Sequence, residues 1–184
     1  ITQNLIDLAE AKGTSVRDLT AVILERDRHN DMIAEVREAG ARIRLISDGD
    51  VVGAITTAWP DSGADILFGI GGTPEGVIAA AALKCMGGVM QGRLWPRNDE
   101  ERSAAIAGGY DLERALTEDD LAGGDNCFFA ATGITDGELL KGVHYTSKVC
   151  TTQSLVMRSK SGTVRLVSAS HNYEKLKAFT DIDF

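Results

Sequence analysis

Residues 65–84, DILFGIGGTPEGVIAAAALK, decide how this sequence folds. The stretch opens with a short apolar run, 66–70, of the length and character of a buried strand, and glycines interrupt and end that run. Thr73 can cap the next element, Pro74 suits its first helical position, and the alanine-rich remainder favours a helix. The stretch therefore predicts a strand, a glycine turn and a helix.

In this geometry, backbone N–H groups and the positive end of the helix point above the C-terminal edge of the strand. Open α/β sheets bind ligands at that edge. Glu75, in the first helical turn, is predicted to lie there. An acid at a helix start is stabilised by about 0.3–1 kcal/mol without any function. The residues alone leave a ligand role and a purely structural role for Glu75 equally open.

Composition limits the class of protein. The length of 184 residues suits one domain or a large piece of a bigger protein, and the net charge of −8 argues against a nucleic-acid partner. Neither a membrane-spanning run nor a signal peptide is apparent, so a cytoplasmic protein is expected. The three widely spaced cysteines indicate reduced thiols rather than a disulfide framework or a zinc site.

Strands and helices alternate along the first half of the chain. Helical periodicity covers residues 1–12, and LTAVIL at 19–24 is a buried-strand run. A helix at 32–39, a strand at 43–46 and a helix at 51–58 follow. Such alternation predicts an α/β fold with a largely parallel sheet and helices on both faces.

The second half of the chain is predicted to be more mixed. Val89, Met90 and Leu94 suggest a strand, residues 99–107 and 117–121 suggest helices, and 125–132 suggest another strand. Two β-prone runs at 153–158 and 163–167 flank a turn, which predicts a C-terminal β-hairpin. His144 and His171 lie in or beside these runs and are expected to be structural.

Charged residues follow the first two predicted strands. Arg26, Arg28 and His29 after the first strand are able to grip a phosphate, although a solvated charged loop is the simpler interpretation. After the second strand, Asp50 is well placed as a helix N-cap. With Asp48, it is also able to accept hydrogen bonds from sugar hydroxyls or to approach Mg²⁺ or Mn²⁺.

Four long stretches carry a close resemblance to a known family. They are LERDRHNDMIAEVREAGARIRLISDGD, GIGGTPEGVIAAAALKCMGG, NCFFAATGITDGELLKGV and TTQSLVMRSKSGTVR. The sequence resembles the class II fructose-1,6-bisphosphatases, a bacterial family within the lithium-sensitive sugar phosphatase group. The resemblance extends over nearly the whole chain and implies a sugar phosphatase-like fold.

The resemblance implies a hydrolase of gluconeogenesis that removes the 1-phosphate of fructose 1,6-bisphosphate with Mn²⁺ or Mg²⁺. It implies that Glu75 binds the divalent metal, and it assigns no catalytic residue to this chain. The residues that it implies for substrate binding are Arg26, Asp27, Arg28, Asp48, Gly49, Asp50 and Gly72.

Two departures from the family pattern stand out. The family usually has proline between the two basic residues, where this chain has Asp27, a negative charge in an anion-binding loop. The family's other metal carboxylates and its Asp-Pro-x-Asp-Gly-Thr segment belong to an N-terminal region that this sequence does not contain. Residues 1–184 are therefore expected to be one α/β domain, the C-terminal part of a longer phosphatase. The missing part is expected as its partner, and this chain alone is expected to be inactive. A homo-oligomer is also expected.

Two alternatives remain open. The first is a broader substrate range that includes sedoheptulose 1,7-bisphosphate, which no residue of the sequence excludes. A second alternative is a non-catalytic module that binds a sugar phosphate. The carboxylates at Asp48, Asp50 and Glu75 weigh against a pure anion binder, since they repel an anion unless metals intervene.

Overall fold

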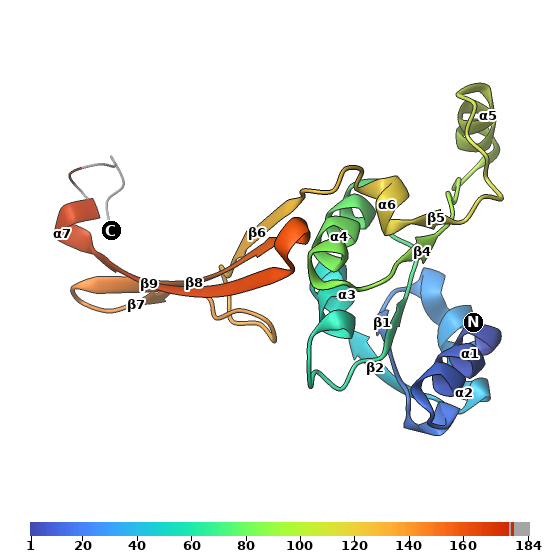
Figure 1. Cartoon of the computed structure of the whole chain (residues 1–184), viewed down its shortest axis with the longest axis horizontal. Coiled ribbons are helices and arrows are strands. Elements are labelled where there is room, and N and C mark those ends of the chain that lie inside the picture. The colour runs from blue at the N-terminus through green and yellow to red at the C-terminus, as the bar shows by residue number, and fades with distance from the viewer. Residues whose placement is uncertain (177, 179–184) are drawn as a thin grey trace.

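The computed structural model describes residues 1–176 and residue 178, and it is built around a three-stranded parallel sheet (Figure 1). The strands β1 (Thr20–Leu24), β2 (Arg42–Ile46) and β3 (Ile66–Phe68) lie in the order β2-β1-β3. The central strand β1 is buried on both faces, as its unbroken apolar run predicts. The predicted parallel α/β architecture is confirmed.

Helices cover both faces of this sheet. On one face, α1 (Thr2–Lys12) and α2 (Asn30–Ala39) pack against β1 through a cluster of buried apolar residues. On the other face lies α3 (Asp50–Ala58), with α4 (Thr73–Met86) beside it. The contact of α3 with the sheet is close at Gly53, where an added Cβ would lie 2.8 Å from Leu67 Cδ1 and 3.4 Å from Val22 Cγ1.

An antiparallel sheet lies beyond α3 and α4, packs against them near the turn of its hairpin, and extends away from the rest of the molecule (Figure 1). The predicted hairpin is confirmed as β8 (Val149–Arg158) and β9 (Thr163–Asn172), joined through a short 3₁₀ turn, Ser159–Ser161. The sheet is larger than the hairpin, because β6 (Phe128–Thr132) and β7 (His144–Tyr145) also pair with β8. A four-residue helix, α7 (Tyr173–Leu176), follows β9.

The connection between the two sheets carries a small excursion. It contains β4 (Gln91–Gly92), α5 (Asp99–Ala107), β5 (Leu116–Thr117) and α6 (Glu118–Leu121), and β4 pairs with β5. Both predicted helices are confirmed. The strand predicted from Val89, Met90 and Leu94 is present but shorter than expected, because only Gln91 and Gly92 pair. Val89 is exposed, and the N–H of Met90 is held by the side chain of Glu118 at 2.9 Å.

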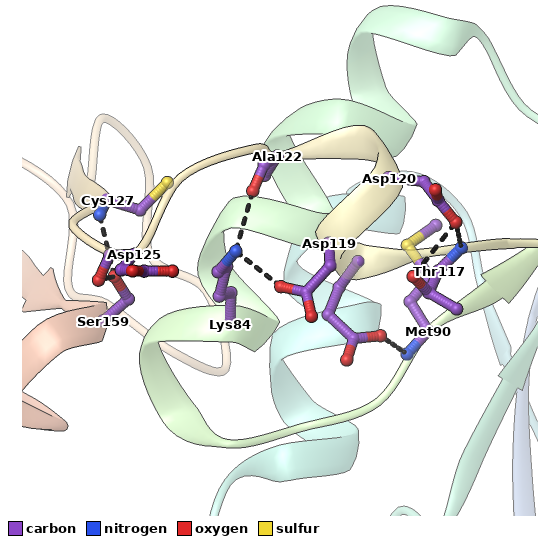
Figure 2. Close-up of polar contacts among 10 residues, drawn as sticks. Lys84, Met90, Thr117, Asp119, Asp120, Ala122, Asp125, Cys127 and Ser159 are labelled. Atoms are coloured by element: carbon purple, nitrogen blue, oxygen red, sulfur yellow. Dashed lines mark hydrogen bonds and ion pairs between the residues drawn. The ribbon is translucent and has the colours of Figure 1, made fainter.

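Polar contacts attach this connection to α4 and to the antiparallel sheet (Figure 2). The Lys84 ammonium donates to the Ala122 carbonyl at 3.0 Å and pairs with Asp119. The hydrogen bond with Asp119 raises the pKa of Lys84 above its ordinary value. Farther along, the Ser159 hydroxyl accepts from the Cys127 N–H at 2.7 Å. The two Lys84 contacts attach the connection to α4, and the Cys127 bond attaches it to the turn between β8 and β9. None of the helices in the described part of the chain is long and apolar enough to cross a bilayer.

Candidate functional site

The carboxyl ends of the three parallel strands meet at one edge of the sheet. The chain leaves β1 for β2 on one side and later returns to β3 on the other side. The loops after β1 and β3 therefore border a switch point, which is where open α/β sheets bind ligands. The three predicted clusters, at 26–29, 47–50 and 71–76, lie in the loops at this edge and at the helix starts that follow them.

The loops after β1 and β3 are joined by hydrogen bonds to Ile70. The Arg28 Nε–H donates to the Ile70 carbonyl at 2.8 Å. The Ile70 N–H donates to His29 Nε2 at 2.9 Å, and His29 Nδ1 lies 2.7 Å from the Leu24 carbonyl. The His29 side chain is 1% exposed, so it is not available to grip a phosphate. The predicted grouping of His29 with the two arginines is thus corrected.

The rest of the β1 loop is open to solvent. Arg26 Nη1 donates to the Glu25 carbonyl at 2.7 Å, and Asp27 begins a 3₁₀ turn, Asp27–His29. The Arg28 side chain uses Nε for Ile70, and within residues 1–176 its Nη groups have no protein hydrogen-bond partner. Those two groups are the ones that a bidentate phosphate contact needs.

The β2 loop brings an aspartate to the β3 loop. The predicted N-cap is wrong by one residue, since Gly49 is the N-cap and Asp50 is the first residue of α3. Gly49 has φ 77°, a left-handed conformation that glycine adopts without steric cost. Asp50 Oδ1 accepts from the Val51 N–H at 2.9 Å. Its Oδ2 would lie 3.3 Å from a Cβ added at Gly71, so this carboxylate adjoins the β3 loop.

The start of α4 places a second carboxylate, that of Glu75, next to the glycine turn after β3. The N-cap is Gly72, so the predicted cap at Thr73 is also wrong by one residue, and Pro74 occupies the second helical position. A Cβ added at Gly72 would lie 2.2 Å from Glu75 Oε2. The Glu75 carboxylate therefore folds back over Gly72, and only glycine leaves room for it there.

The oxygens at this edge are of the type that hard divalent cations prefer. Asp50 and Glu75 lie against consecutive glycines, and Asp48 lies in the same β2 loop, exposed to solvent. Among the described residues, His, Cys, Asp and Glu form no group of three or more that could hold a metal ion. These carboxylates fit a metal as contributing ligands, and do not by themselves complete its coordination.

Two hollows lie away from this edge. One, of about 620 Å³, is lined by Asp136, Lys141, His144 and neighbouring residues. In it, the exposed His144 Nε2 lies 2.8 Å from Asp136 Oδ1. The Gly142 N–H and then His144 hold the pKa of Asp136 below its ordinary value. The other hollow, of about 540 Å³, lies between Arg44, Trp59 and Leu139. Neither contains a residue of the three strand-end clusters.

Comparisons with known proteins identify the family of this chain. Residues 1–171 match the family described as bacterial fructose-1,6-bisphosphatase, glpX-encoded. The chain is 39% identical over 195 residues to fructose-1,6-bisphosphatase class 2 of Haemophilus influenzae, an alignment that covers 99% of this chain and 59% of the relative. It is 38% identical over 188 residues to fructose-1,6-bisphosphatase 1 class 2 of Escherichia coli K12, which covers 95% of this chain and 56% of the relative. The chain thus spans less than two thirds of the length of these curated relatives, and it belongs to the glpX-encoded family of bacterial fructose-1,6-bisphosphatases.

Proposed function

We propose that this chain supplies the sugar-phosphate binding edge and one metal ligand for hydrolysis of the 1-phosphate of fructose 1,6-bisphosphate to fructose 6-phosphate. The observation that carries the proposal is the convergence of three strand-end loops. Arg28 is bonded to Ile70, Asp50 adjoins Gly71, and Glu75 lies over Gly72. The Arg28 guanidinium, two carboxylates and the backbone N–H groups at the start of α4 thus lie at one edge of the parallel sheet.

Each residue has a distinct role in the proposed site. Arg28, fixed through Nε, presents its Nη groups to a phosphate, with Arg26 and Asp27 in the same loop. Asp48, Gly49 and Asp50 contact the sugar, whose hydroxyls donate to the two carboxylates. Gly72 lets the substrate approach its backbone, and Glu75 holds a divalent cation, Mn²⁺ or Mg²⁺. Such a cation, when bound, lowers the pKa of water and offsets charge on the transferring phosphoryl group.

A single glutamate does not assemble a hydrolytic metal centre. We therefore propose that the chain binds the sugar phosphate by itself and needs ligands from further residues to hydrolyse it. The test uses two proteins. One is the chain as it stands, and the other is a grafted enzyme in which this chain replaces the 188 aligned residues of the Escherichia coli relative. Turnover by the chain alone with Mn²⁺ or Mg²⁺ would contradict the proposed division of ligands.

The role of Glu75 is tested by Glu75→Gln in the grafted enzyme, since this change keeps the shape and removes the charge. We expect turnover to fall by about 100-fold or more and the Mn²⁺ requirement to rise, because a metal ligand is lost. The matched control is Glu100→Gln, in the first turn of α5, where the acid has only the favourable interaction with the helix start. Equal activity of the two variants at low Mn²⁺ would show that Glu75 is only a helix-start acid.

Calorimetry distinguishes this enzyme role from a binding module. Fructose 1,6-bisphosphate is titrated into the chain with Mn²⁺ and then with EDTA. We expect weaker binding in EDTA, because the carboxylates of Asp48, Asp50 and Glu75 then repel the phosphates. Equal affinity in both conditions would favour a non-catalytic module. Sedoheptulose 1,7-bisphosphate, tested in the same assays, measures the breadth of the substrate range.

A further inference from the structure

His29 is a buried side chain that the proposed chemistry does not use. It is 1% exposed and lies directly after Arg28 in the β1 loop. Its Nδ1 lies 2.7 Å from the carbonyl of Leu24, the last residue of β1. A carbonyl oxygen only accepts hydrogen bonds, so Nδ1 carries the hydrogen.

The other ring nitrogen faces the β3 loop, 41 residues farther along the chain. The Ile70 N–H donates to His29 Nε2 at 2.9 Å, which requires a lone pair on that nitrogen. The longer approach of Nε2 to the Ile70 carbonyl, at 3.2 Å, is then a contact between two acceptors and not a hydrogen bond. The ring therefore donates to the end of β1 through one nitrogen and accepts from the β3 loop through the other. Gly69 lies close beside the ring, since an added Cβ there would be 3.7 Å from His29 Cε1.

Ile70 is held at both of its backbone polar groups by two consecutive residues. His29 accepts from its N–H, and Arg28 Nε donates to its carbonyl at 2.8 Å. Ile70 precedes Gly72, the N-cap of α4, by two residues, and Glu75 lies in the first turn of that helix. The position of Ile70 thus determines where the phosphate-facing Arg28 and the carboxylate of Glu75 stand relative to each other.

We propose that His29 is a positioning residue for this site. Through Ile70, it fixes the β3 loop against the β1 loop, so that Arg28, Gly72 and Glu75 are held in one geometry before substrate arrives. The role of His29 rests on the proposed function, because it acts on the substrate through that site. The structural part of this role, in which His29 holds the β3 loop in place, is measurable without an activity assay.

Two isosteric substitutions separate the two hydrogen bonds of the ring. Counted in bonds from Cα, the amide atoms of asparagine correspond to His29 Nδ1, and those of glutamine correspond to Nε2. His29→Asn is thus able to donate to Leu24 but not to reach Ile70, whereas His29→Gln is able to accept from the Ile70 N–H. His29→Phe removes both bonds and keeps a ring. The matched control is His171→Phe, in β9, where the ring nitrogen lies 3.0 Å from the Thr152 hydroxyl and far from the parallel sheet in sequence and layer.

The first measurement is hydrogen exchange of residues 69–76 in the chain itself. We expect faster exchange in His29→Asn and His29→Phe, and exchange close to the unsubstituted chain in His29→Gln and His171→Phe. If His29→Phe fails to fold, the Asn and Gln variants decide the question. Equal protection of the β3 loop in the Asn and Gln variants, or better protection in Asn, would overturn the proposal.

The second measurement is steady-state kinetics in the grafted enzyme. We expect His29→Asn to raise the KM for fructose 1,6-bisphosphate and the half-activating Mn²⁺ concentration, each by about 10- to 100-fold, as loss of a supporting residue does. His29→Gln should restore most of both, whereas a merely structural role would lower the amount of active enzyme and leave KM unchanged. An inactive unsubstituted graft would refute the proposed function, and the exchange data would still decide whether His29 clamps the loop.

Discussion

Gly72→Ala should disturb the proposed metal ligand without disturbing the fold. Gly72 has φ −72° and ψ 149°, a backbone conformation that alanine adopts readily. The new Cβ would lie 2.2 Å from Oε2 and 3.2 Å from Cδ of Glu75, whereas ordinary contact begins at 3.4 Å. The Glu75 carboxylate must therefore retreat by roughly 1 Å. It has room to do so because the side chain is exposed.

The change is expected to affect metal binding strongly and stability little. Replacing glycine by alanine where the backbone fits stabilises a protein by about 0.4–1 kcal/mol, because the unfolded chain loses freedom. A displacement of about 1 Å in a binding group costs up to about 100-fold in function. Alanine is a poorer N-cap than glycine, which offsets the gain in stability, so we expect the stability of the alanine variant to lie within about 1 kcal/mol of that of the unsubstituted chain. We expect it to need about 10- to 100-fold more Mn²⁺ for half-maximal activity.

Gly76→Ala provides the matched control for this prediction. Gly76 lies four residues farther along, inside α4, and an added Cβ there meets nothing within 4 Å. This change should stabilise the helix by about 1 kcal/mol and leave the Glu75 carboxylate in place. Urea unfolding of the chain gives the stability, and Mn²⁺ titration of the grafted enzyme gives the metal requirement. If the two variants have the same Mn²⁺ requirement, the Glu75 carboxylate over Gly72 is not a metal ligand.

Two further predictions concern stability. Leu155, in β8, is fully buried against α3 and α4, so Leu155→Ala should lower the free energy of unfolding in urea by about 2–5 kcal/mol. Its cross-strand partner Leu166 is 53% exposed, and Leu166→Ala should cost less than about 1 kcal/mol; equal losses would contradict the layer order. Burial acts to raise the pKa of Asp65, but hydrogen bonds from Lys12 and the Thr20 N–H outweigh it and lower that pKa below 3.8. The resulting stabilisation is complete above the ordinary pKa and is lost as the pH falls through the pKa of the folded state. Asp65→Asn should therefore lower the free energy of unfolding by about 1 kcal/mol at neutral pH and by little in strong acid. Urea unfolding at both pH values measures the difference.

The parallel half of the fold was predictable because its signals are local. The run at 19–24 is apolar throughout, as a strand covered on both faces must be, and the intervening helices have their own periodicity. The antiparallel sheet was predicted only as a hairpin. Its other partners, β6 and β7, pair with β8 across long loops, and no local pattern specifies such a register. The strand expected from Val89 to Leu94 is reduced to the two residues of β4, and a side chain of α6 takes the N–H of Met90 just before them.

The grouping of the proposed site residues at one edge followed from a single rule about strand ends, but the local details did not. Alternating strands and helices place the loops after β1, β2 and β3 at one edge, and that rule was enough to group Arg28, Asp50 and Glu75. Both helix starts were predicted one residue too late. Gly49 and Gly72 are the N-caps, although serine, threonine, asparagine and aspartate are the residues most favoured there. At Gly72, the Glu75 carboxylate occupies the space that a Cβ would take, a contact that the helix pattern alone does not predict.

His29 shows why a strand-end residue cannot be assigned from its neighbours alone. In the sequence, it stands beside two arginines, and the two interpretations there were a phosphate-binding group and a solvated charged loop. Neither predicted a buried side chain. Its actual partner, Ile70, lies 41 residues away, and the two meet only because β3 lies next to β1 rather than next to β2. A different strand order would have left the same histidine exposed and available to a ligand. Because of the observed strand order, the Arg28 side chain is exposed and its Nη groups are open to solvent, whereas the His29 side chain is buried. The two residues share one backbone unit of the β3 loop, so a ligand that moves the Arg28 guanidinium must act on the start of α4 as well.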